Sequence, residues 1–271
     1  MSQYTKLSGE TRVIAIIGDP IAQVKSPAGV TQALLDQGRN ALVVPFHIKP
    51  ADLDQLMQGI SLVRNFDGVI ATVPHKFSAY KYCATATERS HFLGAANVLR
   101  RNPDGSWHGD MVDGPAFVSG IRSAGCQPQG QHALLVGAGG AGCAIALELL
   151  QAGVAELAVH DEDAQRREAL LARLNARFGG RVCAGSADPT GFTLVVNATP
   201  VGMQASDPYP VRVEKFTAAM FVADVITSPA VTPMIAAARE VGCATQVGGG
   251  MFSANQDMML QVLLEDGPLS R

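Results

Sequence analysis

The feature that most constrains this chain is a glycine-rich loop at residues 137–142, which reads Gly-Ala-Gly-Gly-Ala-Gly. The apolar run before it predicts a strand over 132–136, and the residues after it predict a helix over 141–152. Between a strand and a helix, such glycines permit a tight turn, let a pyrophosphate approach the backbone and let the helix pack closely. The helix N-terminus also offers N–H groups to phosphates. The loop therefore predicts a dinucleotide site that uses Gly137, Ala138, Gly139, Gly140 and Ala141. The alternative is a glycine-rich turn without a ligand.

An acidic turn follows the next predicted strand, which covers 156–160. Asp161 lies about 20 residues past the glycine loop, the usual place of an acid that accepts hydrogen bonds from the adenosine ribose. Such an acid also repels a 2′-phosphate, and Arg166 lies further on, in the predicted helix. We therefore predict NAD as the cofactor, with NADP disfavoured. The alternative is that the acids at 161–163 only solvate a turn and begin a helix, where negative charge is favourable.

Strands and helices alternate along the rest of the chain, which predicts an α/β fold. Short β-branched runs predict strands over 12–17, 41–48 and 67–73, with helices between them. Ser26 and Pro27 are typical of a helix N-cap and first turn. A turn sequence at 102–105 predicts a hairpin between strands at 97–101 and 107–110. Beyond the glycine loop, further strands are expected over 182–184, 193–197, 220–224 and 244–247, with helices over 115–124, 164–178 and 251–264.

Charge and cysteine usage exclude several classes of protein. The 21 basic and 24 acidic residues are nearly balanced, which argues against a nucleic-acid partner. No apolar run approaches the roughly 20 residues of a membrane helix, and the polar N-terminal residues do not resemble a signal peptide. The five cysteines are scattered without a C-x-x-C pair, so no metal site is expected. These patterns predict a cytoplasmic protein that binds no membrane.

Hydride transfer to or from an alcohol needs a group that exchanges the alcohol proton. Lys76 follows the third predicted strand, and the carboxyl ends of parallel strands line ligand crevices in open α/β sheets. Asp113 is the best candidate for the acid that holds this lysine. The alternative is that this lysine is a solvated surface residue, which is the commoner role of a lysine after a strand.

Several motifs, in a fixed order, resemble those of the shikimate/quinate dehydrogenase family over nearly the whole chain. They are Gly18-Asp19-Pro20-Ile21-Ala22 with Lys25-Ser26-Pro27, Thr72-Val73-Pro74-His75-Lys76, Gly94-Ala95-Ala96-Asn97, Gly109-Asp110-Met111-Val112-Asp113-Gly114, the loop at 136–141, Asn197-Ala198-Thr199-Pro200-Val201-Gly202-Met203, Asp224-Val225, Thr232-Pro233-Met234 and Gly248-Gly249-Gly250-Met251.

The resemblance implies reversible NAD(P)-linked oxidation of a ring hydroxyl on a small cyclic hydroxy acid. Lys76 would be the general acid/base and Asp113 its partner. The implied substrate contacts are Ser26, Thr72, Asn97, Thr227 and Asn255. The implied further cofactor contacts are Asn197, Thr199, Val225 and Gly248. The family also implies a substrate-binding domain of residues 1–113 and 248–271, a Rossmann-like dinucleotide-binding domain of residues 114–247, a cleft between them, and a monomer or homodimer.

The departures from the family pattern concern substrate recognition. Val24 stands where the family has a first serine, Ile70 where an asparagine is common, and Val112 where a threonine is usual. Thr227 replaces a tyrosine, Asn255 replaces a glutamine, and His160-Asp161-Glu162 replaces an asparagine-arginine-threonine cofactor signature. Losing one charge-assisted hydrogen bond to the substrate carboxylate costs about 1.5–3 kcal/mol of binding free energy.

Two interpretations of the substrate therefore remain. The chain is a shikimate or quinate dehydrogenase of low activity, or it acts on a related ring acid such as an amino-substituted shikimate. Two other classes are alternatives, a folate-linked methylene dehydrogenase and a protein that holds NAD without turnover. The segments around Asn97 and Asp113 argue against the first, and the presence of both Lys76 and Asp113 argues against the second.

Overall fold

The computed structural model describes residues 7–270, which form two compact units. The first unit extends to Val112 and resumes at Gln256, and the second covers Asp113–Asn255. The second boundary therefore falls inside the C-terminal helix rather than before it at residue 248, where we had expected it. The reason is the packing of this helix, because its later turns bury their apolar residues in the core of the first unit.

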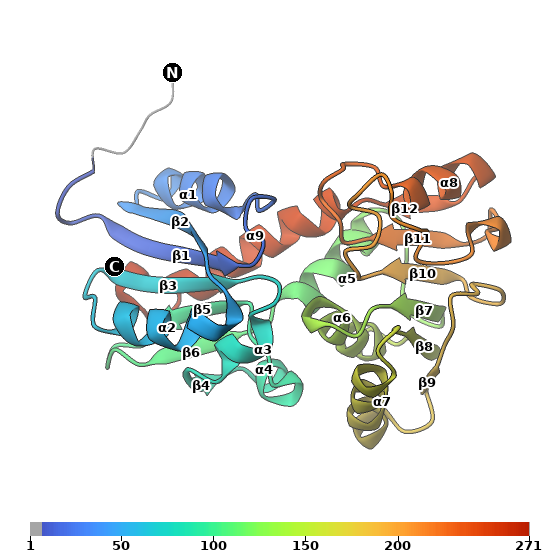
Figure 1. The fold of residues 1–271 in the computed structure, drawn as a ribbon, viewed down its shortest axis with the longest axis horizontal. Helices are drawn as coiled ribbons and strands as arrows, with labels where there is room; N and C mark the ends of the chain where they lie inside the picture. Colours follow the sequence, from blue (N-terminus) through green and yellow to red (C-terminus); the bar gives the residue numbers. More distant parts are fainter. Residues whose placement is uncertain (1–6, 271) are drawn as a thin grey trace. The chain divides into compact units, whose positions relative to one another are not determined.

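The first unit is built on a mixed six-stranded sheet with the order β2-β1-β3-β5-β6-β4 (Figure 1). Strands β2 (Ala41–His47) and β3 (Phe66–Ala71) run parallel to β1 (Arg12–Gly18) on either side of it. The expected hairpin is present, since β5 (Val98–Arg101) and β6 (Trp107–Asp110) pair antiparallel. The edge strand β4 (Cys83–Ala86) runs parallel to β6. The helical segments of this unit are α1 (Ser26–Asp36), the short helix Pro50–Asp52, α2 (Leu53–Ser61), α3 (Lys76–Tyr80), α4 (Glu88–Leu93) and, near the C-terminus, Pro268–Ser270.

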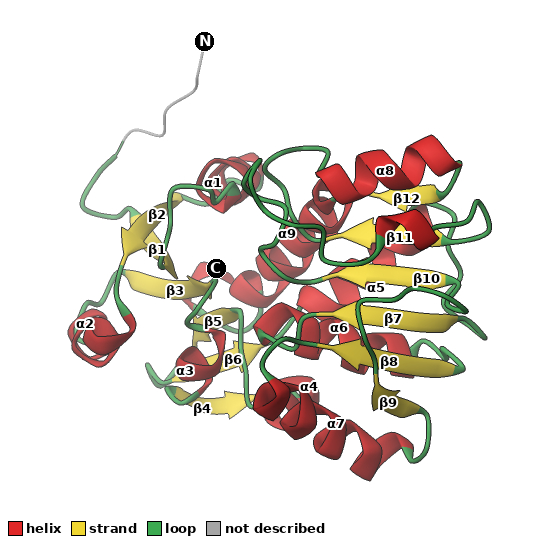
Figure 2. Cartoon of the chain, turned by 45° about the vertical axis from the view of Figure 1, so that its right-hand side comes forward, coloured by secondary structure: helices red, strands yellow, loops and turns green. Residues whose placement is uncertain are grey.

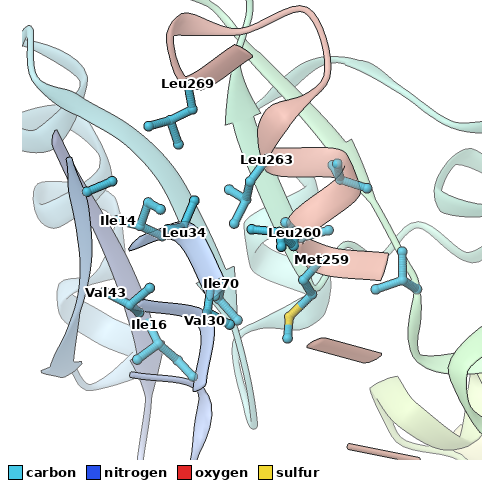
Figure 3. Packing of buried hydrophobic residues seen from close by; sticks show 14 residues of the cluster. Ile14, Ile16, Val30, Leu34, Val43, Ile70, Met259, Leu260, Leu263 and Leu269 are labelled. Atoms are coloured by element: carbon cyan, nitrogen blue, oxygen red, sulfur yellow. The ribbon is translucent and has the colours of Figure 1, made fainter. Parts of the chain in front are cut away.

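One apolar core of this unit joins segments from both ends of the chain. Figure 3 shows side chains of β1, α1, β2 and β3 meeting those of the C-terminal helix α9 (Gly248–Leu264). The labelled members are Ile14, Ile16, Val30, Leu34, Val43, Ile70, Met259, Leu260, Leu263 and Leu269. Burying one such side chain stabilises a fold by roughly 1.5–3 kcal/mol, so residues 256–270 are an integral part of the first unit. A second apolar cluster of this unit includes Leu53, Met57 and Ile60 of α2.

The second unit contains a fully parallel sheet with the order β12-β11-β10-β7-β8-β9. Its strands are β7 (His132–Val136), β8 (Glu156–His160), β9 (Val182–Ala184), β10 (Leu194–Asn197), β11 (Phe221–Asp224) and β12 (Ala244–Gln246). Its helical segments are α5 (Asp113–Ser123), α6 (Gly140–Gln151), α7 (Ala164–Phe178), the short helix Val213–Lys215, α8 (Pro233–Val241) and the start of α9. Figure 2 shows β10, β7 and β8 side by side in this sheet. Strand order reverses between β7 and β10, and ligands of such sheets bind at the carboxyl ends of the strands beside that reversal.

These two sheets confirm the predicted α/β fold class, in which a Rossmann-like unit follows an α/β unit. Three local predictions were wrong. Helix α1 begins at Ser26 after Lys25, without a side-chain cap, so Ser26 is not the N-cap. Helix α5 begins at Asp113 rather than at residue 115. Helix α9 begins at Gly248 rather than at Met251, so the three glycines lie in its first turn.

Within residues 7–270, no helix has the length and apolar character that a membrane span requires. Across the same residues, histidine, cysteine and acidic side chains do not gather into a group of three that could hold a metal ion.

Candidate functional site

The glycine loop of the second unit has the geometry that a dinucleotide pyrophosphate needs. Gly137 follows β7 with φ +104°, a left-handed conformation that favours glycine. A Cβ on Gly142 would collide with the carbonyl oxygen of Gly137, so this glycine lets α6 pack against the turn. A Cβ on Gly139 would meet no atom within 4 Å. The open space therefore lies beside Gly139, directly before the α6 N-terminus, where phosphate oxygens can approach the backbone.

Asp161 lies beside this loop, at the carboxyl end of β8. Its carboxylate accepts the Ala138 N–H at 2.6 Å and the Asp163 N–H at 2.9 Å. The Arg166 guanidinium donates to both Asp161 oxygens, through Nε at 3.1 Å and Nη2 at 2.7 Å. Arg166 lies in α7, as predicted, but the first turn of that helix brings its side chain back onto the acid.

The electrostatics of Asp161 follow from these contacts. Burial alone would raise the pKa of its carboxyl, but the hydrogen bonds from Arg166, Ala138 and Asp163 outweigh that effect, so its pKa lies below the ordinary value. Asp161 is therefore a fixed negative charge next to the backbone of the glycine loop.

A second polar network closes the carboxyl ends of β10 and β11. The Asn197 amide oxygen accepts the Thr199 N–H at 3.0 Å and the Thr199 hydroxyl at 2.7 Å. The Asn197 amide nitrogen donates to the Val201 carbonyl at 3.1 Å and to Asp224 at 3.3 Å. Asp224 also accepts the Ile226 N–H and the Thr232 hydroxyl. Burial raises the pKa of the Asp224 carboxyl to about 6.

This network brings together four of the expected cofactor residues. The Val225 N–H donates to the Asn197 carbonyl at 3.1 Å. The Thr199 methyl group lies where a Cβ on Gly137 would stand, which joins the network to the glycine loop. A Cβ on Gly248 would collide with the Ile226 carbonyl, so α9 starts in close contact with the segment after β11. Thr227, half-buried, lies in that same segment.

In the first unit, the expected catalytic lysine follows β3. Thr72 continues β3, donates its N–H to Ile17 at 3.0 Å, and lies where a Cβ on Gly18 would stand. His75 is buried and its Nε2 lies 2.8 Å from the Ile48 carbonyl, which holds the turn against the end of β2. Lys76 is the first residue of α3, and its carbonyl accepts the Ala96 N–H at 3.0 Å. The backbone at Lys76 is thus held from two neighbouring segments.

Asn97 is almost fully buried and connects three segments of the first unit. Its N–H donates to the Asp110 carbonyl at 2.9 Å, and its carbonyl accepts the Ala71 N–H at 2.8 Å. Its amide oxygen accepts the Val112 N–H at 2.9 Å, which fixes the orientation of the amide. Ser26 is also buried, at the start of α1.

Asp113 follows Val112 as the first residue of α5 and belongs to the second unit, with 2% of its surface exposed. Asn255, in the first half of α9, donates its amide N–H to the Asp113 carboxylate at 2.7 Å. The three apolar residues that depart from the family pattern contribute to packing. Ile70 and Val112 belong to the core of Figure 3, and Val24 packs against it.

Sequence reasoning missed two residues of this site. The reach of Arg166 onto Asp161 depends on the geometry of the α7 start. The role of Asp224 as a buried acceptor depends on contacts from three separate segments. An arginine five residues after a strand-end acid was the available signal for the first pair.

Comparison with known proteins agrees with this architecture. The model of the shikimate dehydrogenase substrate-binding domain matches residues 16–99. A shikimate dehydrogenase (NADP+) of Rubrobacter xylanophilus is 34% identical over 249 residues, which are 90% of this chain and 87% of that protein. The chain belongs to the shikimate/quinate dehydrogenase family.

Solved structures of the same family superpose over almost the whole chain. A shikimate dehydrogenase in complex with NADP+ has a TM-score of 0.88 at 25% identity and covers 97% of this chain and 93% of its own. A quinate dehydrogenase of Corynebacterium glutamicum in complex with NAD has a TM-score of 0.84 at 28% identity, covering 96% of each chain. Members of the shikimate/quinate dehydrogenase family thus bind either nicotinamide cofactor.

Proposed function

We propose that this protein reversibly oxidises a ring hydroxyl of shikimate, quinate or a close analogue with a nicotinamide cofactor. The observation that carries the proposal is the combination, in a member of this family, of a glycine loop open beside Gly139 with Lys76 and Asp113 at the starts of their helices. The cofactor, when bound, supplies or accepts the hydride.

The chain's own residues handle the substrate and its proton. Lys76 takes the proton of the hydroxyl oxygen during oxidation and returns it during reduction. We assign Asp113 as the acidic partner of that lysine. Asn97, whose amide oxygen is held by Val112, directs its amide nitrogen to a substrate hydroxyl. Ser26 and Thr72 donate hydroxyl hydrogen bonds to the ring acid.

We further propose that NAD is preferred. Asp161 holds its charge beside the glycine loop, and Arg166 is already paired with it. A 2′-phosphate on the ribose would meet this carboxylate, whereas ribose hydroxyls donate to it. The Rubrobacter relative is named for NADP+ instead. Titration of both cofactors at one substrate concentration decides it, and a lower KM for NADP would overturn the assignment.

A second candidate substrate is a ring acid with altered substituents, such as an amino-substituted shikimate. The packing of Val24 against the core supports a changed substrate pocket, because a valine offers no hydrogen bond where the family has a serine. A rate screen of shikimate, quinate and amino-substituted analogues separates the two candidates.

Replacing Lys76 by alanine tests the proton-transfer role. We expect Lys76→Ala to lower kcat by about 10²–10⁴-fold while cofactor affinity stays within about twofold, because the lysine exchanges a proton and belongs to the first unit, whereas the glycine loop belongs to the second. Lys81→Ala is the matched control, since Lys81 is an exposed lysine at the end of the same helix. A kcat of Lys76→Ala equal to that of the control would refute the mechanism.

A further inference from the structure

The contact between Asn255 and Asp113 joins two residues that are 142 positions apart in the sequence. Asp113 opens α5 and Asn255 lies two turns into α9, and both belong to the second unit. The amide nitrogen stands 2.7 Å from a carboxylate oxygen that is almost fully buried. Such a short bond between an amide and a carboxylate is of the charge-assisted kind, about twice as strong as a neutral hydrogen bond.

This bond acts on the orientation of Asp113. It restricts the side-chain rotation of Asp113, because Asn255 is itself carried by a long helix. A carboxylate that has to hold a lysine in place needs this fixed orientation.

The same contact disagrees with the role that the family resemblance implied for Asn255. A residue that binds substrate directs its polar atoms toward the substrate, but here the amide nitrogen is directed at a protein carboxylate. The next residue, Gln256, is directed elsewhere, since its side-chain oxygen lies against Gly29 in α1.

We infer that Asn255 is a positioning residue that holds the Asp113 carboxylate in its orientation, rather than a direct substrate contact. The inference rests on the proposed function, in which Asp113 supports Lys76. It makes the α9 asparagine part of the proton-transfer machinery of this enzyme, acting through Asp113 without touching the reacting atoms.

A kinetic double-mutant cycle tests this inference. Asn255→Leu keeps the approximate volume and removes the donor, so we expect kcat to fall about 10- to 100-fold, the loss of one charge-assisted hydrogen bond. The KM of the ring substrate is expected to change less than about threefold. In an Asp113→Asn background, the same leucine substitution is expected to change kcat less than about twofold, because the group through which it acts is gone.

Two further variants complete the test. Asn255→Asp keeps the shape of the side chain and places a second negative charge next to Asp113. It is expected to lower kcat at least as much as Asn255→Leu does. Ser253→Ala, at an exposed position on the same helix, is the control and should match the wild type.

The outcomes separate the two proposals. Wild-type protein that turns over no cyclic hydroxy acid would refute the proposed function. If the wild type is active, the positioning role would be refuted by an Asn255→Leu variant whose KM rises more than tenfold at unchanged kcat. It would also be refuted if the fold-losses in kcat of the Asn255 and Asp113 variants multiplied in the double variant.

Discussion

Two acids stand at the carboxyl ends of strands in the same parallel sheet, and their electrostatics are opposite. Asp161 follows β8 and Asp224 ends β11, and both are buried. Arg166 donates to both oxygens of Asp161, whose pKa is lowered. The hydrogen bonds that Asp224 accepts from Asn197, Ile226 and Thr232 come from neutral donors, and burial raises its pKa to about 6.

The difference shows what hydrogen bonds from neutral groups can and cannot do. Such donors orient the Asp224 carboxylate, yet they do not offset the loss of its hydration. One guanidinium, together with two backbone N–H groups, does so for Asp161. Asp161 is therefore suited to be a permanent charge beside the glycine loop. Asp224 is suited to hold the loops after β10 and β11 together.

The largest expected effect is at Asp224. A carboxyl whose pKa is raised on folding stabilises the fold fully below its unfolded value of 3.8, and this stabilisation is lost as pH rises through about 6. Asp224→Asn keeps the shape without the charge, so its free energy of unfolding should exceed that of wild type by up to about 3 kcal/mol at pH 7–8. Urea denaturation from pH 4 to pH 8 measures the difference, which should shrink toward pH 4. A difference that stays constant with pH would contradict the comparison.

The same substitution at Asp161 should have the opposite sign. Its pKa is depressed on folding, so the stability that it contributes is present at neutral pH and is lost as pH falls through the lowered folded value. Asp161→Asn should therefore destabilise the protein by about 1–2 kcal/mol at pH 7, because Arg166 is half exposed and partly screened. Glu168→Gln, which breaks the surface pair with Arg167, is the control and should change stability by less than about 0.5 kcal/mol. If Asp161→Asn destabilised the protein no more than Glu168→Gln does, the buried ion pair of Asp161 would stabilise the fold no more than the surface pair.

The smallest effect extends the comparison to a third strand end. Gln246 ends β12, is 3% exposed, and neither of its amide atoms has a hydrogen-bond partner among the residues that the structure describes. Replacing an unsatisfied buried amide by a thioether of similar size should raise the free energy of unfolding by about 1 kcal/mol. Thermal denaturation of Gln246→Met measures it, with Gln261→Met on the exposed face of α9 as the control. A lower melting temperature for Gln246→Met alone would mean that its amide is satisfied in solution.

Local signals predicted those elements whose ends are marked in the sequence itself. Helix α7 covers Ala164–Phe178 as expected, because the Asp163 side chain caps its first turn and Gly179 follows its last residue. Strands β7, β8 and β10 were predicted within a residue or two, since buried parallel strands are continuous apolar runs. The glycine loop and its following acid were located for the same reason.

The rest depended on contacts that are distant in the sequence. Strand β4 is short, half exposed and at a sheet edge, so it carries no hydrophobic alternation and forms only because β6 pairs with it. The glycines at 248–250 predict a loop, but they lie in the first turn of α9. Position 248 requires a glycine because the Ile226 carbonyl occupies the space of a side chain. The contacts of Asp113 with Asn255 and of Asp161 with Arg166 likewise depend on where helices begin.

The division of α9 between the two units has a consequence for biosynthesis. Leu260, Leu263 and Leu269 complete the core around Ile14, but a ribosome makes them after the whole of the second unit. The first 112 residues therefore emerge without part of their own core. We expect the second unit to reach its native state on the ribosome while the first waits for residues 256–270. Chaperone binding to nascent chains should consequently persist on the segment that is translated earliest.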